Sequence, residues 1–156
     1  MTICYATLRH TAMQNNNFRI QFIERSCSLA SNAEHLSAIR MMVQELADML
    51  YPEHAEALVE SALAREAQEA TYVGRGLAVP HARVAGLPGA AVYVASCEKG
   101  IAWPQQEADT VVLLAVPDEA PELYLQLLSK TMRWRMKGQN LAELRELLAP
   151  TAAPQQ

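Results

Sequence analysis

The sequence has few cysteines, no long apolar run and no excess of basic residues, and each lack excludes a class of protein. Its three cysteines, Cys4, Cys27 and Cys97, are widely spaced and form no CxxC pair, which argues against a disulfide framework and a structural zinc site. No apolar segment is long enough to cross a bilayer, and polar residues interrupt the N-terminus where a secretory signal needs an apolar core. A net charge of −4 and a pI near 5.6 argue against non-specific nucleic-acid binding. We therefore expect a cytoplasmic protein without membrane insertion or a nucleic-acid partner.

The motifs of several common enzyme classes are also missing. There is no GxxxxGK[ST] phosphate loop, no HExxH metal motif and no GxSxG nucleophile elbow. The four histidines, His10, His35, His54 and His81, are too far apart for any metal-ligand spacing rule to apply. These absences argue against a nucleotide kinase, a metallohydrolase and a serine hydrolase, and we expect no metal and no cofactor.

The composition that is present is typical of one globular domain. The chain has 156 residues, of which 51% are hydrophobic and 19% are charged, enough for a sizeable core in a single domain. Residues 1–16 show no hydrophobic period and lead into a run of three asparagines at 15–17, so we expect a poorly ordered lead-in. The domain is predicted over residues 17–149, followed by a loose tail at 150–156.

Hydrophobic periodicity predicts an alternation of strands and helices. Helices are expected over 34–50, 53–69 and 119–137, with a last helix capped by Asn140 and ending at Leu148. Strands are expected over 18–22, 77–79, 90–96 and 110–116, with a short edge strand at 101–103, a loop at 26–32, and turns at 86–89 and 99–100. This order predicts an α/β fold, a three-layer α/β/α sandwich with a mixed central β-sheet.

The stretch from Gly74 to Arg83 combines two glycines, a short apolar run and a histidine directly behind a proline. Leu77–Val79 is bounded by breakers and is typical of a buried strand. Pro80 fixes its own φ and favours extended geometry in the residue before it, so we expect the strand to end there. This places His81 at a rigid strand end, where open α/β sheets commonly carry their chemistry.

The residue types around His81 favour phosphoryl chemistry. A neutral imidazole is a competent nucleophile toward phosphorus, and the reaction needs cationic or N–H donors for the phosphoryl oxygens. Arg65 lies sixteen residues upstream, near the end of a predicted helix, and could supply such donors. Structural alternatives remain: His81 could be a core histidine, Arg65 could complement the helix dipole, and Arg75 and Arg83 could meet an acidic partner or be solvated.

The segment from Arg65 to Ala82 resembles the phosphorylation-site signature of the mannitol/fructose-type enzyme IIA domains of the bacterial phosphoenolpyruvate-dependent sugar phosphotransferase system. Its elements are Arg65-Glu66, then Val73-Gly74, then Leu77-Ala78-Val79-Pro80-His81-Ala82. The nitrogen-regulatory IIA proteins share this signature, and the wider match covers residues 18–148. The resemblance implies a phosphotransferase in which His81 accepts a phosphoryl group from the histidine phosphocarrier protein. His81 would then pass it to a cysteine of a IIB partner, with Arg65 as the active-site arginine.

One position departs from the family pattern. The family usually carries a second histidine at the start of the long C-terminal helix, and Tyr124 occupies that place. A tyrosine hydroxyl can donate a hydrogen bond but cannot become cationic, so charge stabilisation would depend more on Arg65 and on backbone N–H groups. Two further hypotheses follow: a nitrogen-type regulatory protein whose phosphorylation state controls binding, or a degenerate homologue that has lost transfer. Tyr124 could also be a rim residue without a part in the chemistry.

Overall fold

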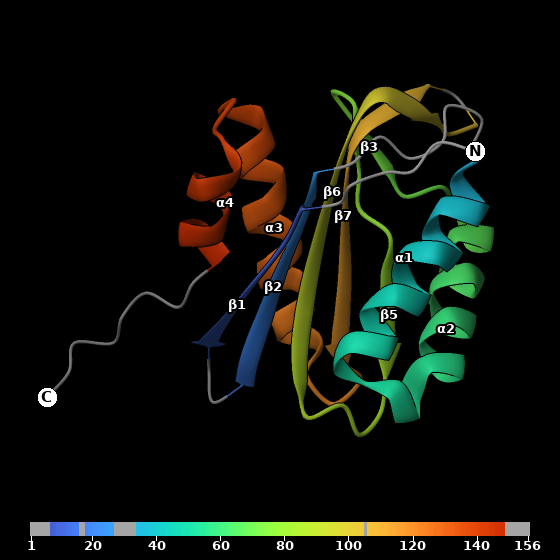
Figure 1. Ribbon diagram of the computed structural model, residues 1–156, viewed down its shortest axis with the longest axis vertical. Coiled ribbons are helices and arrows are strands. Elements are labelled where there is room, and N and C mark those ends of the chain that lie inside the picture. Colours follow the sequence, from blue (N-terminus) through green and yellow to red (C-terminus); the bar gives the residue numbers. More distant parts are fainter. Residues whose placement is uncertain (1–6, 16–17, 27–33, 105, 149–156) are drawn as a thin grey trace, which may run out of the picture.

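A mixed sheet of seven strands forms the centre of the molecule (Figure 1). The computed structural model describes residues 7–15, 18–26, 34–104 and 106–148. The strands follow the order β1-β2-β6-β7-β4-β3, and β5 pairs with β7 beyond β4. Their bounds are β1 Thr7–Asn15, β2 Phe18–Ser26, β3 Tyr72–Gly74, β4 Leu77–Ala78, β5 His81–Val84, β6 Gly89–Ala102 and β7 Glu107–Pro117.

Two pairs of helices cover the sheet. Their bounds are α1 His35–Leu50, α2 Ala55–Gln68, α3 Pro121–Met136 and α4 Leu141–Leu148, with a 3₁₀ turn at Pro52–His54 before α2. All four agree with the helices expected from periodicity to within a few residues. Asn140 caps α4 as predicted, because its Oδ1 accepts the Glu143 N–H at 2.9 Å while Glu143 Oε1 accepts the Asn140 N–H. Among the helices in the described ranges, none has both the length and the apolar character of a bilayer-crossing segment.

The helix pairs lie on opposite faces of the sheet, with α1 and α2 on one side and α3 and α4 on the other (Figure 1). One buried cluster joins the first pair to the sheet, and a second cluster joins the other pair to the opposite face. Residues of β7 alternate between the two clusters, Val111 and Leu113 in the first and Val112 and Leu114 in the second. The predicted three-layer α/β/α sandwich with a mixed sheet is confirmed.

The expectation of a poorly ordered lead-in is wrong for Thr7–Asn15, which form the edge strand β1. This strand pairs antiparallel with β2, from Thr7 opposite Ser26 to Asn15 opposite Phe18. Main-chain ladders need no hydrophobic alternation on an edge strand, so the missing period was a poor guide. The predicted tail and most of the predicted 26–32 loop lie outside the described residues.

The turn expected at 99–100 is a second correction. β6 runs without a break from Gly89 to Ala102 and includes the segment at 101–102 that was expected to be separate. Its pairing with β7 changes register between Ser96 and Ile101, and Gly100 has φ +76°. A glycine with positive φ therefore marks an irregularity within one strand here, because such a bulge allows pairing to continue beyond it.

The strand predicted to end at Pro80 does end before it, because β4 covers Leu77–Ala78 and a separate strand, β5, begins at His81. Leu77 pairs with Thr110 and His81 with Leu114, so β4 and β5 follow β7 in the same register. The carbonyl of Pro80 accepts the Leu114 N–H at 3.0 Å, although the proline has no N–H to return. His81 thus stands at the start of β5 and is fixed by main-chain pairing on both sides of the proline.

A tight hairpin joins β3, which the sequence did not predict, to β4. Its two connecting residues, Arg75 and Gly76, have φ of +53° and +74°. Positive φ at both positions is the geometry of a type I′ turn and is strained for a residue with a Cβ. Arg135 of α3 binds this turn, since its Nε and Nη2 donate to the Arg75 carbonyl at 2.9 and 2.7 Å.

Candidate functional site

His81 lies on β5, a strand whose only pairing partner in the described sheet is β7. The free edge of β5 is covered by α2 through Ser61. The Arg83 N–H donates to Ser61 Oγ at 2.9 Å, and the Ser61 hydroxyl faces the Arg83 carbonyl at 3.2 Å. Because Ser61 binds both main-chain groups of one residue, it aligns α2 with the strand that begins at His81.

A buried carboxylate fixes the end of α2 and the approach to β4. Glu66 is 5% exposed and accepts hydrogen bonds from the Thr71 N–H at 2.9 Å, the Thr71 hydroxyl at 2.5 Å and Trp103 Nε1 at 3.3 Å. The Thr71 carbonyl in turn accepts the Val79 N–H at 2.9 Å. This chain of contacts connects Arg65, the neighbour of Glu66, to the strand segment that precedes His81.

The structure brings the three predicted site residues together around one hollow. His81, Arg65 and Tyr124 line a depression of about 570 Å³ between α2, β5 and α3. The remaining lining residues are Ser61, Ala64, Gln68, Arg83 and Asp118. Side chains from two helices and a strand edge therefore converge on a histidine that is only 7% exposed.

The His81 imidazole is held neutral. Its pKa falls from 6.5 to about 4, first because burial removes water from the charged form and next because the Arg65 guanidinium is close. The backbone of Val79 opposes this shift, and Arg83 adds to it. Among the described residues Nδ1 has no hydrogen bond of good geometry. At neutral pH the ring thus keeps a lone pair available for nucleophilic attack.

Tyr124 packs directly against His81. The two ring centroids lie 4.3 Å apart and the ring planes are tilted by 35°. Burial raises the pKa of Tyr124, while Arg65 and Arg83 act in the opposite direction. The phenol is therefore neutral at physiological pH, so it shields the imidazole from water and brings no charge to the hollow.

Arg65 makes one hydrogen bond at the C-terminal end of α2, as expected for a residue that complements the helix dipole. Its Nη1 donates to the Glu69 carbonyl at 2.9 Å, close to the C-terminal end of α2. The guanidinium has five N–H groups, so this bond leaves donors for a ligand in the hollow. A role at the helix end and a role at the site are compatible.

Sequence reasoning missed four lining residues of this hollow and left Arg83 undecided; the missed residues are Ser61, Ala64, Gln68 and Asp118. Arg83 forms an ion pair with Asp118, with Nη2 and Oδ1 3.1 Å apart. Alternation along β5 was a usable signal for Arg83, because residues two apart in a strand share a face. Ser61 gave no such signal, since its contact with β5 depends on how α2 packs.

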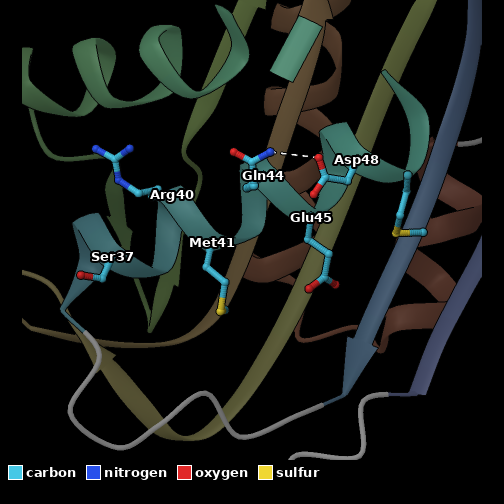
Figure 2. Close-up of a pocket in the computed structure, with 7 residues that line it drawn as sticks. Ser37, Arg40, Met41, Gln44, Glu45 and Asp48 are labelled. Atoms are coloured by element: carbon cyan, nitrogen blue, oxygen red, sulfur yellow. Dashed lines mark hydrogen bonds between the residues drawn. The ribbon is translucent and has the colours of Figure 1, made fainter. Parts of the chain in front are cut away.

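A second hollow, of about 580 Å³, runs along the outer surface of α1. Figure 2 shows Met41 and Glu45 extending from one side of this helix and Arg40 and Gln44 from the other. Glu45 is engaged in structure, as its carboxylate accepts bonds from Arg25 Nη1 and the Tyr93 hydroxyl, both at 2.6 Å. The lining of this hollow contains no histidine, and we place the functional site at His81.

No group of three or more histidine, cysteine, aspartate or glutamate side chains suited to a metal ion occurs within the described ranges. Two of the side chains that line the hollow with His81, Arg65 and Arg83, are arginines, whose planar guanidinium matches the oxygens of phosphate or carboxylate. The chemistry available at this site is therefore nucleophilic attack by nitrogen with cationic stabilisation of an anion.

A mixed sheet covered by two helix pairs is the fold of the IIA-type proteins. The chain belongs to the family "Phosphoenolpyruvate-dependent sugar phosphotransferase system, EIIA 2", whose model matches residues 18–153. Members of this family are generally phosphotransfer proteins, and the resemblance described from the sequence is confirmed at this level.

Two curated relatives share part of the sequence. The 2-O-α-mannosyl-D-glycerate-specific EIIABC component of Escherichia coli K12 is 36% identical over 110 residues, which cover 65% of this chain and 17% of that protein. The transcriptional regulator ManR of Bacillus subtilis 168 is 32% identical over 69 residues, covering 44% of this chain and 11% of the regulator. The chain therefore matches less than a fifth of the length of either relative.

Solved structures share the fold at lower sequence identity. IIA-Ntr from Neisseria meningitidis aligns with a TM-score of 0.62 at 21% identity, covering 83% of this chain and 84% of that chain. The mannitol IIA of Escherichia coli aligns with a TM-score of 0.52 at 22% identity, covering 75% and 90%. A complex of that mannitol enzyme with phosphorylated IIB aligns with a TM-score of 0.51 at 19% identity, covering 82% and 92%.

Proposed function

We propose that this chain is a phosphocarrier of the sugar phosphotransferase system, in which His81 accepts a phosphoryl group from the histidine phosphocarrier protein. It then passes the group to a cysteine of a IIB partner in the cytoplasm. The observation that carries this proposal is a buried, neutral imidazole in a hollow shared with the Arg65 guanidinium. Family membership supports the same chemistry, and the solved complex of mannitol IIA with phosphorylated IIB supports a partner of that kind.

The proposed transfer uses Nε2 of His81. Nδ1 is buried and has no hydrogen-bond partner among the described residues, so the proposal assigns the transfer to the other ring nitrogen, Nε2. Nε2 forms a bond to phosphorus as the donor histidine leaves with its electron pair. In the second transfer the IIB thiolate bonds to phosphorus, and Nε2 leaves with its pair restored.

The test is labelling by the natural relay. Phosphoenolpyruvate, enzyme I and the phosphocarrier protein are expected to phosphorylate wild type once, on His81, and His81→Ala not at all. Equal labelling of the two proteins, or labelling of neither, would overturn the proposal. Subsequent addition of IIB components would show whether the group moves on to a cysteine and which sugar system accepts it.

A regulatory role is the second proposal, and two observations favour it. By the family resemblance Tyr124, which contacts the His81 ring, takes the place of a second histidine, and part of the chain is related to a transcriptional regulator. A phosphohistidine adds a charge of about −2, enough to change which proteins dock around the hollow. Pull-downs with phosphorylated and unphosphorylated chain would test this, because identical partners in both states would contradict regulation through His81.

A further inference from the structure

We infer that Arg83 is a second phosphoryl-binding residue of this site, paired with Asp118 while His81 is free and turning to the phosphoryl oxygens when His81 carries them. This inference rests on the proposed function, because it names a further residue for the same transfer. Nothing in the family resemblance assigned Arg83 a role, and sequence reasoning left it either solvated or at a partner surface.

The position of Arg83 is fixed by its strand. Residues two apart on a β-strand project from the same face, so Arg83 leaves β5 on the side of His81, and both line the hollow. Ser61 binds both main-chain groups of Arg83, which anchors the backbone. Any adjustment toward a ligand therefore involves only the flexible side chain.

The partner of Arg83 is exchangeable. Its Nη2 lies 3.1 Å from Asp118 Oδ1, and the two side chains are 40% and 58% exposed. Exposed ion pairs contribute little stability and are readily replaced by a stronger anion. A phosphoryl dianion has twice the charge of the Asp118 carboxylate and three oxygens for the guanidinium fork. Arg83 can therefore leave Asp118 without a large loss.

The hollow also needs a second cation. Arg65 already donates one N–H to the Glu69 carbonyl, and Tyr124 is neutral, since burial raises its pKa. A dianion on His81 would sit beside the negative charge of Asp118 with one guanidinium to balance it. Arg83 supplies the missing positive charge. It does so from β5, the strand of His81, because Tyr124 of α3 supplies no cation.

The test is the equilibrium of phosphoryl exchange with the histidine phosphocarrier protein, which is independent of docking rates. Arg83→Gln is expected to shift this equilibrium about tenfold away from phosphorylated His81, as for loss of a charge-assisted hydrogen bond. Asp118→Asn is expected to shift it about threefold the other way, because the unphosphorylated state loses its competing ion pair. Arg83→Lys should retain part of the effect.

A matched control is Arg133→Gln, on the exposed part of α3 about 14 Å along the helix from Tyr124. It changes net charge equally and should leave the equilibrium at the wild-type value. A second readout is the ³¹P titration of the phosphohistidine, since loss of a nearby cation raises the phosphoryl pKa. That readout remains valid if a variant is labelled slowly.

The outcomes separate the two proposals. Labelling of His81 in all variants, with Arg83→Gln equal to Arg133→Gln in equilibrium and in phosphoryl pKa, overturns the role of Arg83 and leaves the phosphocarrier intact. If Asp118→Asn lowers the equilibrium phosphorylation of His81 as much as Arg83→Gln does, the role of Arg83 is also overturned. The Arg83–Asp118 ion pair would then be structural. Absence of His81 labelling in wild type overturns both proposals together.

Discussion

The imidazole of His81 and the phenol of Tyr124 lie in ring contact, with centroids 4.3 Å apart and planes tilted by 35°. The contact excludes water from His81, which is only 7% exposed. This burial is the leading cause of the low pKa of His81. Tyr124 thus contributes desolvation to the His81 ring and brings no charge to it. The consequences can be measured residue by residue.

The size of the Tyr124 side chain, more than its hydroxyl, should control the titration of His81. Tyr124→Ala admits water and is expected to raise the His81 pKa from about 4 toward its ordinary 6.5. Tyr124→Phe preserves the packing and should leave that pKa close to the wild-type value. An NMR titration of the His81 ring compares the two, and equal pKa values in both variants would contradict the desolvating role.

Removal of the Arg65 guanidinium should change both the pKa of His81 and the rate at which His81 is phosphorylated. Arg65→Gln is expected to raise the His81 pKa, because the neighbouring cation disfavours protonation of the ring. It should also slow phosphorylation at least about tenfold through loss of phosphoryl stabilisation. Arg133→Gln, on the exposed surface of α3, is the charge control. Wild-type labelling rates in Arg65→Gln would exclude this residue from the site.

The stability of the fold should depend on pH through His81. A histidine whose folded pKa is lowered binds its proton more weakly in the folded chain than in the unfolded chain. Stability therefore falls as the pH decreases from 6.5 toward about 4. Between pH 7 and pH 5 the expected loss is about 2 kcal/mol. Urea unfolding at pH 7 and pH 5 measures this loss in unfolding free energy, which should be smaller in His81→Asn. An equal loss in that variant would contradict the lowered pKa of His81.

The buried Glu66 carboxylate should be essential to the stability of α2 and its loop. Glu66→Ala leaves the donors of Thr71 and Trp103 without their acceptor. The expected loss in unfolding free energy is about 2–4 kcal/mol. Glu60→Ala, an exposed substitution on the same helix, should change it by less than about 0.5 kcal/mol. Comparable urea midpoints for the two variants would show that the network contributes little.

The helices and the central strand were predictable because their signals are local. The apolar run of β7 and the cap at Asn140 depend on residues close in sequence. β1 was missed since main-chain pairing with β2 needs no period, and Gly100 was mistaken for a turn because a positive φ suits a bulge equally well. Pro80 separates β4 from β5 as predicted, although both strands keep one register along β7.

The site was predictable in part for a similar reason. The motif indicated His81 and Arg65, and the packing of α2 against β5 brings both to one hollow. Ser61 and Asp118 join them only through tertiary contacts with Arg83, which no sequence spacing encodes. The burial that lowers the His81 pKa is also a property of the packed chain rather than of the motif.

The most direct test of the account is the site of phosphorylation after incubation with phosphoenolpyruvate, enzyme I and the histidine phosphocarrier protein. Peptide mapping under alkaline conditions and ³¹P–¹⁵N NMR would identify the residue and the nitrogen that carry phosphorus. The account predicts one phosphoryl group, on Nε2 of His81, and none in His81→Ala. Phosphorylation elsewhere, or an unlabelled wild-type chain, would contradict it.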